Sequence, residues 1–437
     1  MPDDARGARD DDALLSDLQR HTFDYFLHEG NPENGLVKDN TREESHASIT
    51  AVGLALACFP VAVERGYLGR SDAVERVLAT LRFFWESEQS EAPDATGHRG
   101  FYYHFLHMDT GRRAWESELS TIDTTFLVAG ALMAAQYFDG DGDETELRHL
   151  ADVLYRRVEW DWALDGDPAV SHGWAPEDGF IPHRWEGYSE ALLLYALALG
   201  SPTHPIPETS YAAWLDTYDW RTLYGHEHVY AGPLFIHQLS HAWVDFRGLQ
   251  DAFMREKGID YFENSRRATY VQQAYAIQNP RGFRGYGENA WGVTASDGPG
   301  PAEHTVDGED RRFWAYLARG VPYGPDDGTL SPWAVVASLP FAPEIVLPAL
   351  AHVNVHHPEV TSKYGFKCSF NPTFPGDETA DGGWISKGYY GLDQGPIVLM
   401  IENYLTGLPW RLMRGCDVLV RGLRRAGFSG GWLDRAG

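Results

Sequence analysis

The sequence is poor in cysteine and has no long apolar run. Its three cysteines, Cys58, Cys368 and Cys416, are an odd number without the close spacing of a redox or metal motif, so we expect no disulfide framework. No apolar stretch approaches the roughly 20 residues that a membrane span requires. Residues 1–12 are polar and acidic and lack the features of a secretory signal. This pattern predicts a flexible N-terminal segment on a cytoplasmic protein that does not enter membranes.

Positive charge is also scarce. The 437 residues include 36 lysines and arginines against 63 aspartates and glutamates, which gives a formal net charge of −27. Such a chain repels the phosphate backbone, so we expect no nucleic-acid partner. A neutral or cationic partner is compatible with this charge, and so is a habitat of high salt.

Several motifs of cofactor and metal chemistry are missing. The sequence contains neither a phosphate-binding glycine-rich loop ending in Lys-Ser/Thr nor a Gly-x-Ser-x-Gly nucleophile turn. The acidic segment 139–143 begins like a calcium-binding loop. However, Glu144 stands where the turn needs glycine, and Leu150 stands where the bidentate glutamate belongs. We therefore predict no cofactor and no metal ion, which leaves paired acids as the chemistry that the chain can offer.

Aromatic and apolar residues are abundant. Hydrophobic residues make up 43% of the chain, with 15 Trp, 22 Tyr and 21 Phe, which is enough for a large core. Apolar periodicity near 3.6 residues predicts about a dozen helices. They cover residues 13–28, 46–66, 71–88, 120–138, 145–162, 186–199, 208–218, 235–256, 260–278, 332–352, 395–405 and 409–421.

Two of these predicted helices are apolar on almost every side. Residues 126–135 and 191–199 contain hardly any polar side chain, which indicates helices that are buried all round. A toroid of six inner and six outer helices would bury them in this way. We therefore expect an all-α toroid in a single domain covering residues 13–437. The alternative, an α-solenoid, should show a sequence repeat of about 34–47 residues, and none is present.

Glu186 and Glu190 are the first candidate catalytic residues. They stand four positions apart, just before the apolar segment that ends at Gly200, so a helix would place both on one face. An acid at the edge of an apolar helix is partly desolvated, which raises its pKa and suits a general acid. The structural alternatives are a first-turn acid favoured by the helix dipole for Glu186 and a buried acid paired with arginine for Glu190.

Asp393 is the second candidate. It lies in the stretch 388–396 beside Tyr390 and Gln394. This combination of acid, amide and aromatic ring is typical of a wall that binds a polar ligand with an apolar face, such as a sugar. Because a Gly-Pro pair follows Asp393, a turn or helix-cap role is the alternative.

Two further motifs have competing interpretations. Ser120 and Asp123 resemble a helix capping box with Asp in place of the usual Glu, and a substrate role for Asp123 is equally open. His237 and His241 have the spacing of a helical metal pair, but Gln238 stands where the glutamate of the zinc-protease motif belongs, and no third ligand is evident. We favour sugar hydroxyl contacts or core hydrogen bonds for these histidines.

Taken together, several stretches resemble the glucoamylase-like family, which includes bacterial β-1,2-glucanases and is related to a domain of cyclic β-1,2-glucan synthases. The likeness runs from about Gly35 to Trp432. The stretches that carry it are Gly100–Phe105, Ser120–Thr124, Gly187–Ala191, Gly200–Pro205, Asp245–Arg247 and Gly391–Pro396.

The resemblance implies an (α/α)6 toroid in which Glu190 matches the general acid and Asp393 the proposed general base. It also implies inversion at the anomeric carbon, which requires the two carboxyl groups to lie about 6.5–9.5 Å apart with a water molecule between them. One departure stands out: the β-1,2-glucanases carry Asp-x-x-Glu where this chain has Ser120-Thr121-Ile122-Asp123. The substrate length, the linkage and the reaction outcome can therefore differ from those of the β-1,2-glucanases.

The expected activity is hydrolysis of a β-1,2-linked glucan or its oligosaccharides, with an oligosaccharide or polysaccharide as the partner. Transfer of the glycosyl unit to another sugar is one alternative, and a sugar-binding protein without catalysis is another. Stacking on sugar rings is expected from Trp243, Trp291, Tyr188 and Tyr390, and contacts to hydroxyls are expected from Asp123, Glu186, His241, Asp245, Arg247, Tyr286 and Gln394.

Overall fold

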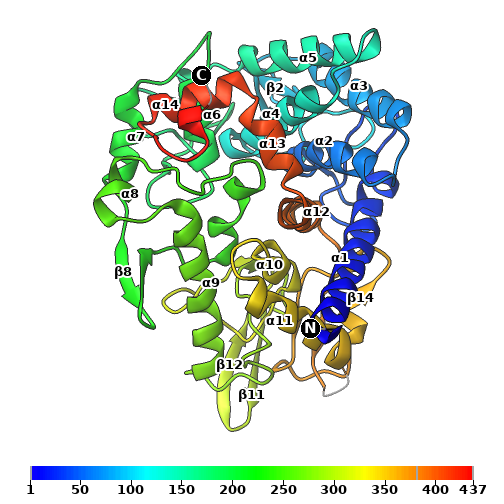
Figure 1. Ribbon diagram of the computed structural model, residues 1–437. Helices are drawn as coiled ribbons and strands as arrows, with labels where there is room; N and C mark the ends of the chain where they lie inside the picture. Colours follow the sequence, from blue (N-terminus) through cyan, green and yellow to red (C-terminus); the bar gives the residue numbers. More distant parts are fainter. Residues whose placement is uncertain (1, 380–381, 436–437) are drawn as a thin grey trace. The chain divides into compact units, whose positions relative to one another are not determined.

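The computed structural model describes residues 2–379 and 382–435, and it is predominantly helical (Figure 1). No helix in this part of the chain combines the length and the apolar character needed to cross a membrane. The α-helices are α1 Pro2–His28, α2 Ile49–Glu64, α3 Arg70–Glu86, α4 Thr121–Tyr137, α5 Asp143–Arg157, α6 Leu192–Gly200, α7 Glu208–Leu215, α8 Ala252–Lys257, α9 Tyr261–Gln278, α10 Pro332–Ala337, α11 Pro343–His356, α12 Gly391–Leu405, α13 Leu408–Arg414 and α14 Asp417–Arg425.

The elements group into two compact units, each assembled from separate stretches of the chain. Unit 1 contains the N-terminal residues up to Asp24, Trp220–Leu239 and Glu263–Thr406. Unit 2 contains Tyr25–Asp219, Ser240–Phe262 and the residues from Gly407 onward. The candidate acid Glu190 therefore belongs to unit 2, and the candidate base Asp393 belongs to unit 1.

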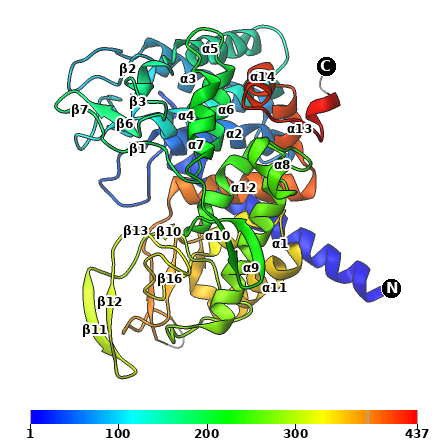
Figure 2. The ribbon, with the colours of Figure 1, turned by 90° about the vertical axis from the view of Figure 1, so that its left-hand side faces the viewer.

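The core of unit 2 is built on the apolar helices α2 and α4, which pack against each other. A glycine on each helix permits the close approach, because a Cβ added at Gly130 would lie 1.9 Å from the carbonyl oxygen of Gly53. Helices α3 and α5 form a second pair and α6 and α14 a third, as the side view of Figure 2 also shows. The apolar runs of the sequence thus become helices that are covered on several sides.

Short strands lie in the loops of unit 2. One antiparallel sheet has the order β2-β3-β5-β6-β7, and β1 pairs with β4. Strand β5 ends at Ser120, directly before α4, so the sheet fixes the start of that helix. The strands are β1 Ala47–Ser48, β2 Gly97–His98, β3 Phe101–Tyr103, β4 Phe105–Leu106, β5 Leu119–Ser120, β6 Gly173–Ala175 and β7 Gly179–Phe180.

Unit 1 packs α10 against α11 and α12, and its loops contain five antiparallel strand pairs among the described residues. The longest pair, β11 and β12, turns at Asp307 and Gly308, both with positive φ. The pairs are β8 Trp220–Leu223 with β9 His226–Val229, β10 Ala295–Ser296 with β13 Leu317–Ala318, β11 Ala302–Val306 with β12 Glu309–Phe313, β14 Thr361–Ser362 with β15 Gly365–Phe366, and β16 Phe370–Asn371 with β17 Trp384–Ile385.

The strands correct the all-α expectation. Most are two or three residues long, too short to show an alternating apolar pattern. The exception is the β11–β12 hairpin, whose five-residue strands are joined by Asp307-Gly308, a pair that is one of the strongest hairpin signals in a sequence. The predominance of helix is confirmed.

Most predicted helices are present, but four of the predicted ranges are not continuous helices. The prediction for 235–256 is wrong, because two 3-10 turns and Gly248, with φ of 74°, come before the short α8. The prediction for 332–352 is interrupted before Pro343, which starts α11 and disfavours helix in the residue before it. The segment 409–421 divides into α13 and α14. The fourth predicted range, 186–199, begins as a loop, and its helix α6 starts only at Leu192.

Candidate active site

Glu190 lies in a loop that leads into α6, not on the helix itself. Gly187 has a φ of 70°, a left-handed conformation that interrupts a right-handed helix, and α6 begins at Leu192. The expectation that Glu186 and Glu190 share a helical face is therefore wrong. Glu186 is exposed, whereas Glu190 is half-buried at the edge of the apolar α6.

The surroundings of Glu190 favour its neutral form. Its backbone carbonyl accepts a hydrogen bond from Ser240 Oγ at 3.0 Å, and Ser240 Oγ in turn accepts from the backbone N–H of Leu193 at 3.2 Å. Burial is the main cause that raises the pKa of the Glu190 carboxyl to about 7, and the negative charge of Asp123 contributes to this rise. Among the described residues no arginine forms an ion pair with Glu190, so the alternative of a paired buried acid is wrong.

Asp123 lies in the first turn of α4 and is held by several hydroxyl groups. Ser120 is the N-cap residue of the helix, and its Oγ accepts from the backbone N–H of Asp123 at 3.1 Å, which confirms the capping interpretation on the serine side. The carboxylate of Asp123 accepts short hydrogen bonds from Thr50 Oγ1 and Ser120 Oγ. It is therefore oriented by α2 and by the start of α4 together.

His104 and Glu118 complete this cluster and were not predicted as site residues. His104 Nδ1 lies 2.9 Å from Glu118 Oε1, and His104 Nε2 lies 3.6 Å from Asp123 Oδ1. Burial alone would lower the pKa of His104, but the charges of Asp123, Glu118 and Asp39 outweigh it and raise this pKa to about 9. The neighbouring carboxylates therefore favour the imidazolium form of His104, in which both ring nitrogens carry a proton.

The buried Asp245 pairs with the half-exposed Arg247 in unit 2. Arg247 donates to both carboxylate oxygens of Asp245, with Nε–Oδ1 at 2.7 Å and Nη2–Oδ2 at 2.8 Å, and Arg414 donates to Oδ2 as well. Burial would raise the pKa of Asp245, but these donors hold it below its usual value. Asp245 therefore fixes Arg247, whose side chain stays half-exposed and lies over the Trp410 ring.

Three predicted substrate contacts lie in the core. Trp243 is stacked on Phe126 with ring centroids 5.4 Å apart, and its side chain has no exposed surface. His241 is also fully buried, and burial lowers its pKa to about 3, so its ring is neutral. Gln394 is fully buried and donates to the carbonyl oxygen of Phe366 at 3.4 Å. None of the three offers a surface on which a sugar could rest, which corrects their predicted roles.

The helix that the four-residue spacing of His237 and His241 would need for a metal pair is not formed. His237 ends one 3-10 turn and His241 lies in the next, so the two do not share an α-helix. Tyr188, a predicted stacking ring, is stacked on Tyr261 instead, with centroids 5.7 Å apart. Of the aromatic residues predicted in unit 2, each already has a protein partner for its ring.

Asp393 lies in the first turn of α12. The helix begins at Gly391, four residues before its predicted start, and the backbone N–H of Asp393 donates to the carbonyl of Tyr390 at 3.0 Å. A carboxylate at this position interacts favourably with the helix N-terminus. The thiol of Cys368 lies in hydrogen-bonding contact with Asp393, and Cys368 Sγ also accepts from the backbone N–H of Asp297 at 3.4 Å.

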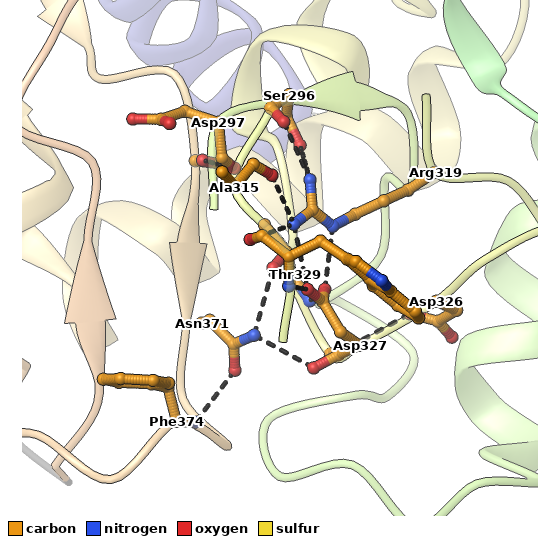
Figure 3. Close-up of polar contacts among 12 residues, drawn as sticks. Ser296, Asp297, Ala315, Arg319, Asp326, Asp327, Thr329, Asn371 and Phe374 are labelled. Atoms are coloured by element: carbon orange, nitrogen blue, oxygen red, sulfur yellow. Dashed lines mark hydrogen bonds and ion pairs between the residues drawn. The ribbon is translucent and has the colours of Figure 1, made fainter. Parts of the chain in front are cut away.

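The segment that carries Asp297 is anchored by a buried ion pair in unit 1. The guanidinium of Arg319 donates to Asp327 through Nε at 2.8 Å and Nη2 at 2.9 Å, and both side chains are fully buried. Figure 3 shows Arg319 between Asp327 and the carbonyl of Ser296, which it contacts at 2.7 Å. Charged hydrogen bonds of this kind fix the loop that places Asp297.

Of the remaining predicted residues of unit 1, Tyr286 is half-buried, and Tyr390 and Trp291 are buried. Tyr286 donates to Asp326 at 2.7 Å and lines a hollow of about 480 Å³ together with His352 and His356. Tyr390 is largely buried, with the Tyr316 ring 6.0 Å away. Trp291 is also buried, only 2% exposed, as expected for a tryptophan with a core role.

Comparison with known proteins identifies relatives over almost the whole chain. Residues 182–417 match the sequence model of the family "Glycoamylase", which is described as "Putative glucoamylase". The crystal structure of a "putative glucoamylase" from Bacteroides uniformis ATCC 8492 is 32% identical, with a TM-score of 0.84, and the match covers 97% of this chain and 98% of that one.

Two further relatives have named activities. An endo-β-1,2-glucanase from Chitinophaga pinensis, solved with sophorotriose and glucose, is 28% identical over 96% of this chain and 98% of its own, with a TM-score of 0.82. An exo β-1,2-glucooligosaccharide sophorohydrolase (non-reducing end) of Parabacteroides distasonis is 29% identical over 95% of this chain. The present chain spans 58% of the length of that relative.

Proposed function

Because the chain belongs to the glucoamylase-like family described as "Putative glucoamylase", we propose that it is a glycoside hydrolase that cleaves β-1,2-linked glucan or its oligosaccharides. The named activities of two relatives that match almost the whole chain support this substrate. We also propose the (α/α)6 toroid, with residues 13–437 as one catalytic domain, as the architecture. Relatives of the same fold and comparable length support it.

In the proposed mechanism Glu190 protonates the glycosidic oxygen and Asp393 activates water, directly or through a substrate hydroxyl. The observation that carries the assignment is the position of Glu190 at the edge of the apolar α6, where burial raises its pKa to about 7 and no arginine among the described residues pairs with it. A carboxyl group with this pKa is about half protonated at neutral pH and can donate its proton to a leaving alkoxide. Inversion would place the two carboxyl groups about 6.5–9.5 Å apart in a crystal structure with substrate.

Four side chains are proposed to bind the sugar. Arg247 is fixed by Asp245 and keeps part of its guanidinium exposed, so it can donate to hydroxyls. Asp123 can accept from a hydroxyl next to the acid, and Tyr286 and Tyr390 supply aromatic surface. Glu186 is exposed and is the least constrained of the predicted contacts.

The test is incubation of the purified protein with linear β-1,2-glucan, sophoro-oligosaccharides, laminarin and starch, with products separated by chromatography. Shorter products from the β-1,2 substrates alone are expected. Products longer than the substrate would show glycosyl transfer instead. Tight binding without any product would show a sugar-binding protein, and either result would overturn the proposed hydrolysis.

The pH dependence of hydrolysis follows from the acid. Glu190 acts only while protonated, so kcat/KM is expected to fall as the pH rises through about 7, the value to which burial raises its pKa. The measurement is kcat/KM on a sophoro-oligosaccharide between pH 4 and 9. A rate that is still level above pH 8 would contradict the assignment of Glu190.

A further inference from the structure

His104, Glu118 and Asp123 form a cluster of charged side chains in unit 2. His104 lies between strands β3 and β4, and its ring is stacked on Phe105 with centroids 3.9 Å apart. Its two nitrogens face two different carboxylates, Glu118 on one side and Asp123 on the other. The contact with Glu118 is a hydrogen bond of 2.9 Å and the contact with Asp123 is an ion pair at 3.6 Å, and the two together give the ring one orientation.

Asp123 in turn connects this histidine to the candidate acid. Its carboxylate is held by Thr50 from α2 and by Ser120 from the end of β5, so it cannot turn away from its neighbours. Its charge is felt by Glu190, whose pKa it helps to raise. The charge of Asp123 therefore influences the ionisation of Glu190.

We propose that His104 is a positioning residue for the acid Glu190, acting through Asp123, whose carboxylate it holds in place and partly neutralises. This inference rests on the proposed role of Glu190. In the chain's Ser120-Thr121-Ile122-Asp123 segment Asp123 is the single acid, so the histidine controls the only carboxylate of that segment. The resemblance to the glucoamylase-like family implies roles for Glu190 and Asp393 and none for His104.

The charged groups that face His104 come from three parts of unit 2. Asp39 precedes β1 and is balanced by Arg42, Glu118 precedes β5 and is balanced by Arg113, and Asp123 belongs to α4. Among the described residues, Asp123 is the side chain whose charge raises the pKa of Glu190. Loss of the imidazolium would leave Asp123 uncompensated, which makes ionisation of Glu190 harder.

The first experiment compares the alkaline limb of kcat/KM on a sophoro-oligosaccharide in the wild type, His104→Gln and Asp123→Asn. The limb should move to higher pH by about half a unit in His104→Gln, because a negative charge near an acid raises its pKa. It should move to lower pH in Asp123→Asn. His98→Gln, which alters a half-buried histidine of strand β2, should leave the limb in place. A limb unmoved in both cluster variants would overturn the proposal.

The second experiment does not depend on turnover. In histidine-labelled wild type followed by NMR, the resonance that disappears in His104→Gln should titrate near pH 9, far above the ordinary value of about 6.5. Titration at or below that ordinary value would overturn the proposal even if hydrolysis is confirmed. Conversely, a titration near 9 in a protein that fails to hydrolyse β-1,2-glucan would disprove the proposed function and leave the ion pair established.

Discussion

Glu190→Gln is expected to lower kcat for a β-1,2-linked oligosaccharide by about 10²–10⁴-fold, the usual contribution of a general acid. A sugar alkoxide is a poor leaving group, so the bond breaks slowly unless a proton is supplied. Glutamine has the same shape as the protonated acid and cannot supply one. Initial rates measured below pH 7, where the wild-type acid is protonated, give the comparison directly.

A nitrophenyl glycoside of the same sugar sharpens this test, because its leaving group needs little protonation. The loss of rate in Glu190→Gln should therefore be much smaller on that substrate. Glu75→Gln, which changes an exposed glutamate on α3, serves as the matched control and should retain full activity. Equal rates for wild type and Glu190→Gln on the natural linkage would remove Glu190 from the mechanism.

Asp327→Asn is expected to lower the free energy of unfolding by about 3–5 kcal/mol, the usual cost of removing one partner of a buried ion pair. Arg319 and Asp327 have no exposed side-chain surface, so water cannot solvate the charge of Arg319 once Asp327 is neutral. The guanidinium would stay buried with a neutral amide beside it. Urea unfolding followed by circular dichroism measures the change.

Asp307→Asn is the control for this variant. Asp307 also pairs with an arginine, Arg284, but both side chains are about half exposed. Exposed pairs contribute little, because water solvates either charge when the other is lost. Its unfolding midpoint should match the wild type, and a similar midpoint for Asp327→Asn would show that the buried pair does not anchor unit 1.

The local features of this protein were predictable from its sequence. The predicted helices at 46–66 and 120–138 correspond to α2 and α4 within a few residues, because a long apolar run has few other ways to bury itself. The Ser120 cap was predicted from two residues three positions apart. Glu190 was singled out as an acid beside an apolar helix, and its raised pKa agrees with that argument.

The helix interruptions could be predicted only in part. Pro343 carries a clear signal at the start of α11, whereas Gly187 and Gly248 act through a left-handed backbone that many helical glycines do not adopt. The displaced start of α6 changed the interpretation of the candidate site most. It separated Glu186, which is exposed, from Glu190, which is half-buried.

The sequence by itself determined the helical character, the acidic charge and the two acids proposed to act. Each of these depends on residue type or on neighbours within one helical turn. Only the tertiary structure decided which acids are desolvated and which are paired. Thr50 and Asp123 are 73 residues apart, and Asp327 and Asn371 are 44 apart, yet each pair is in contact. Burial and charge pairing depend on such distant neighbours, and no local pattern contains them.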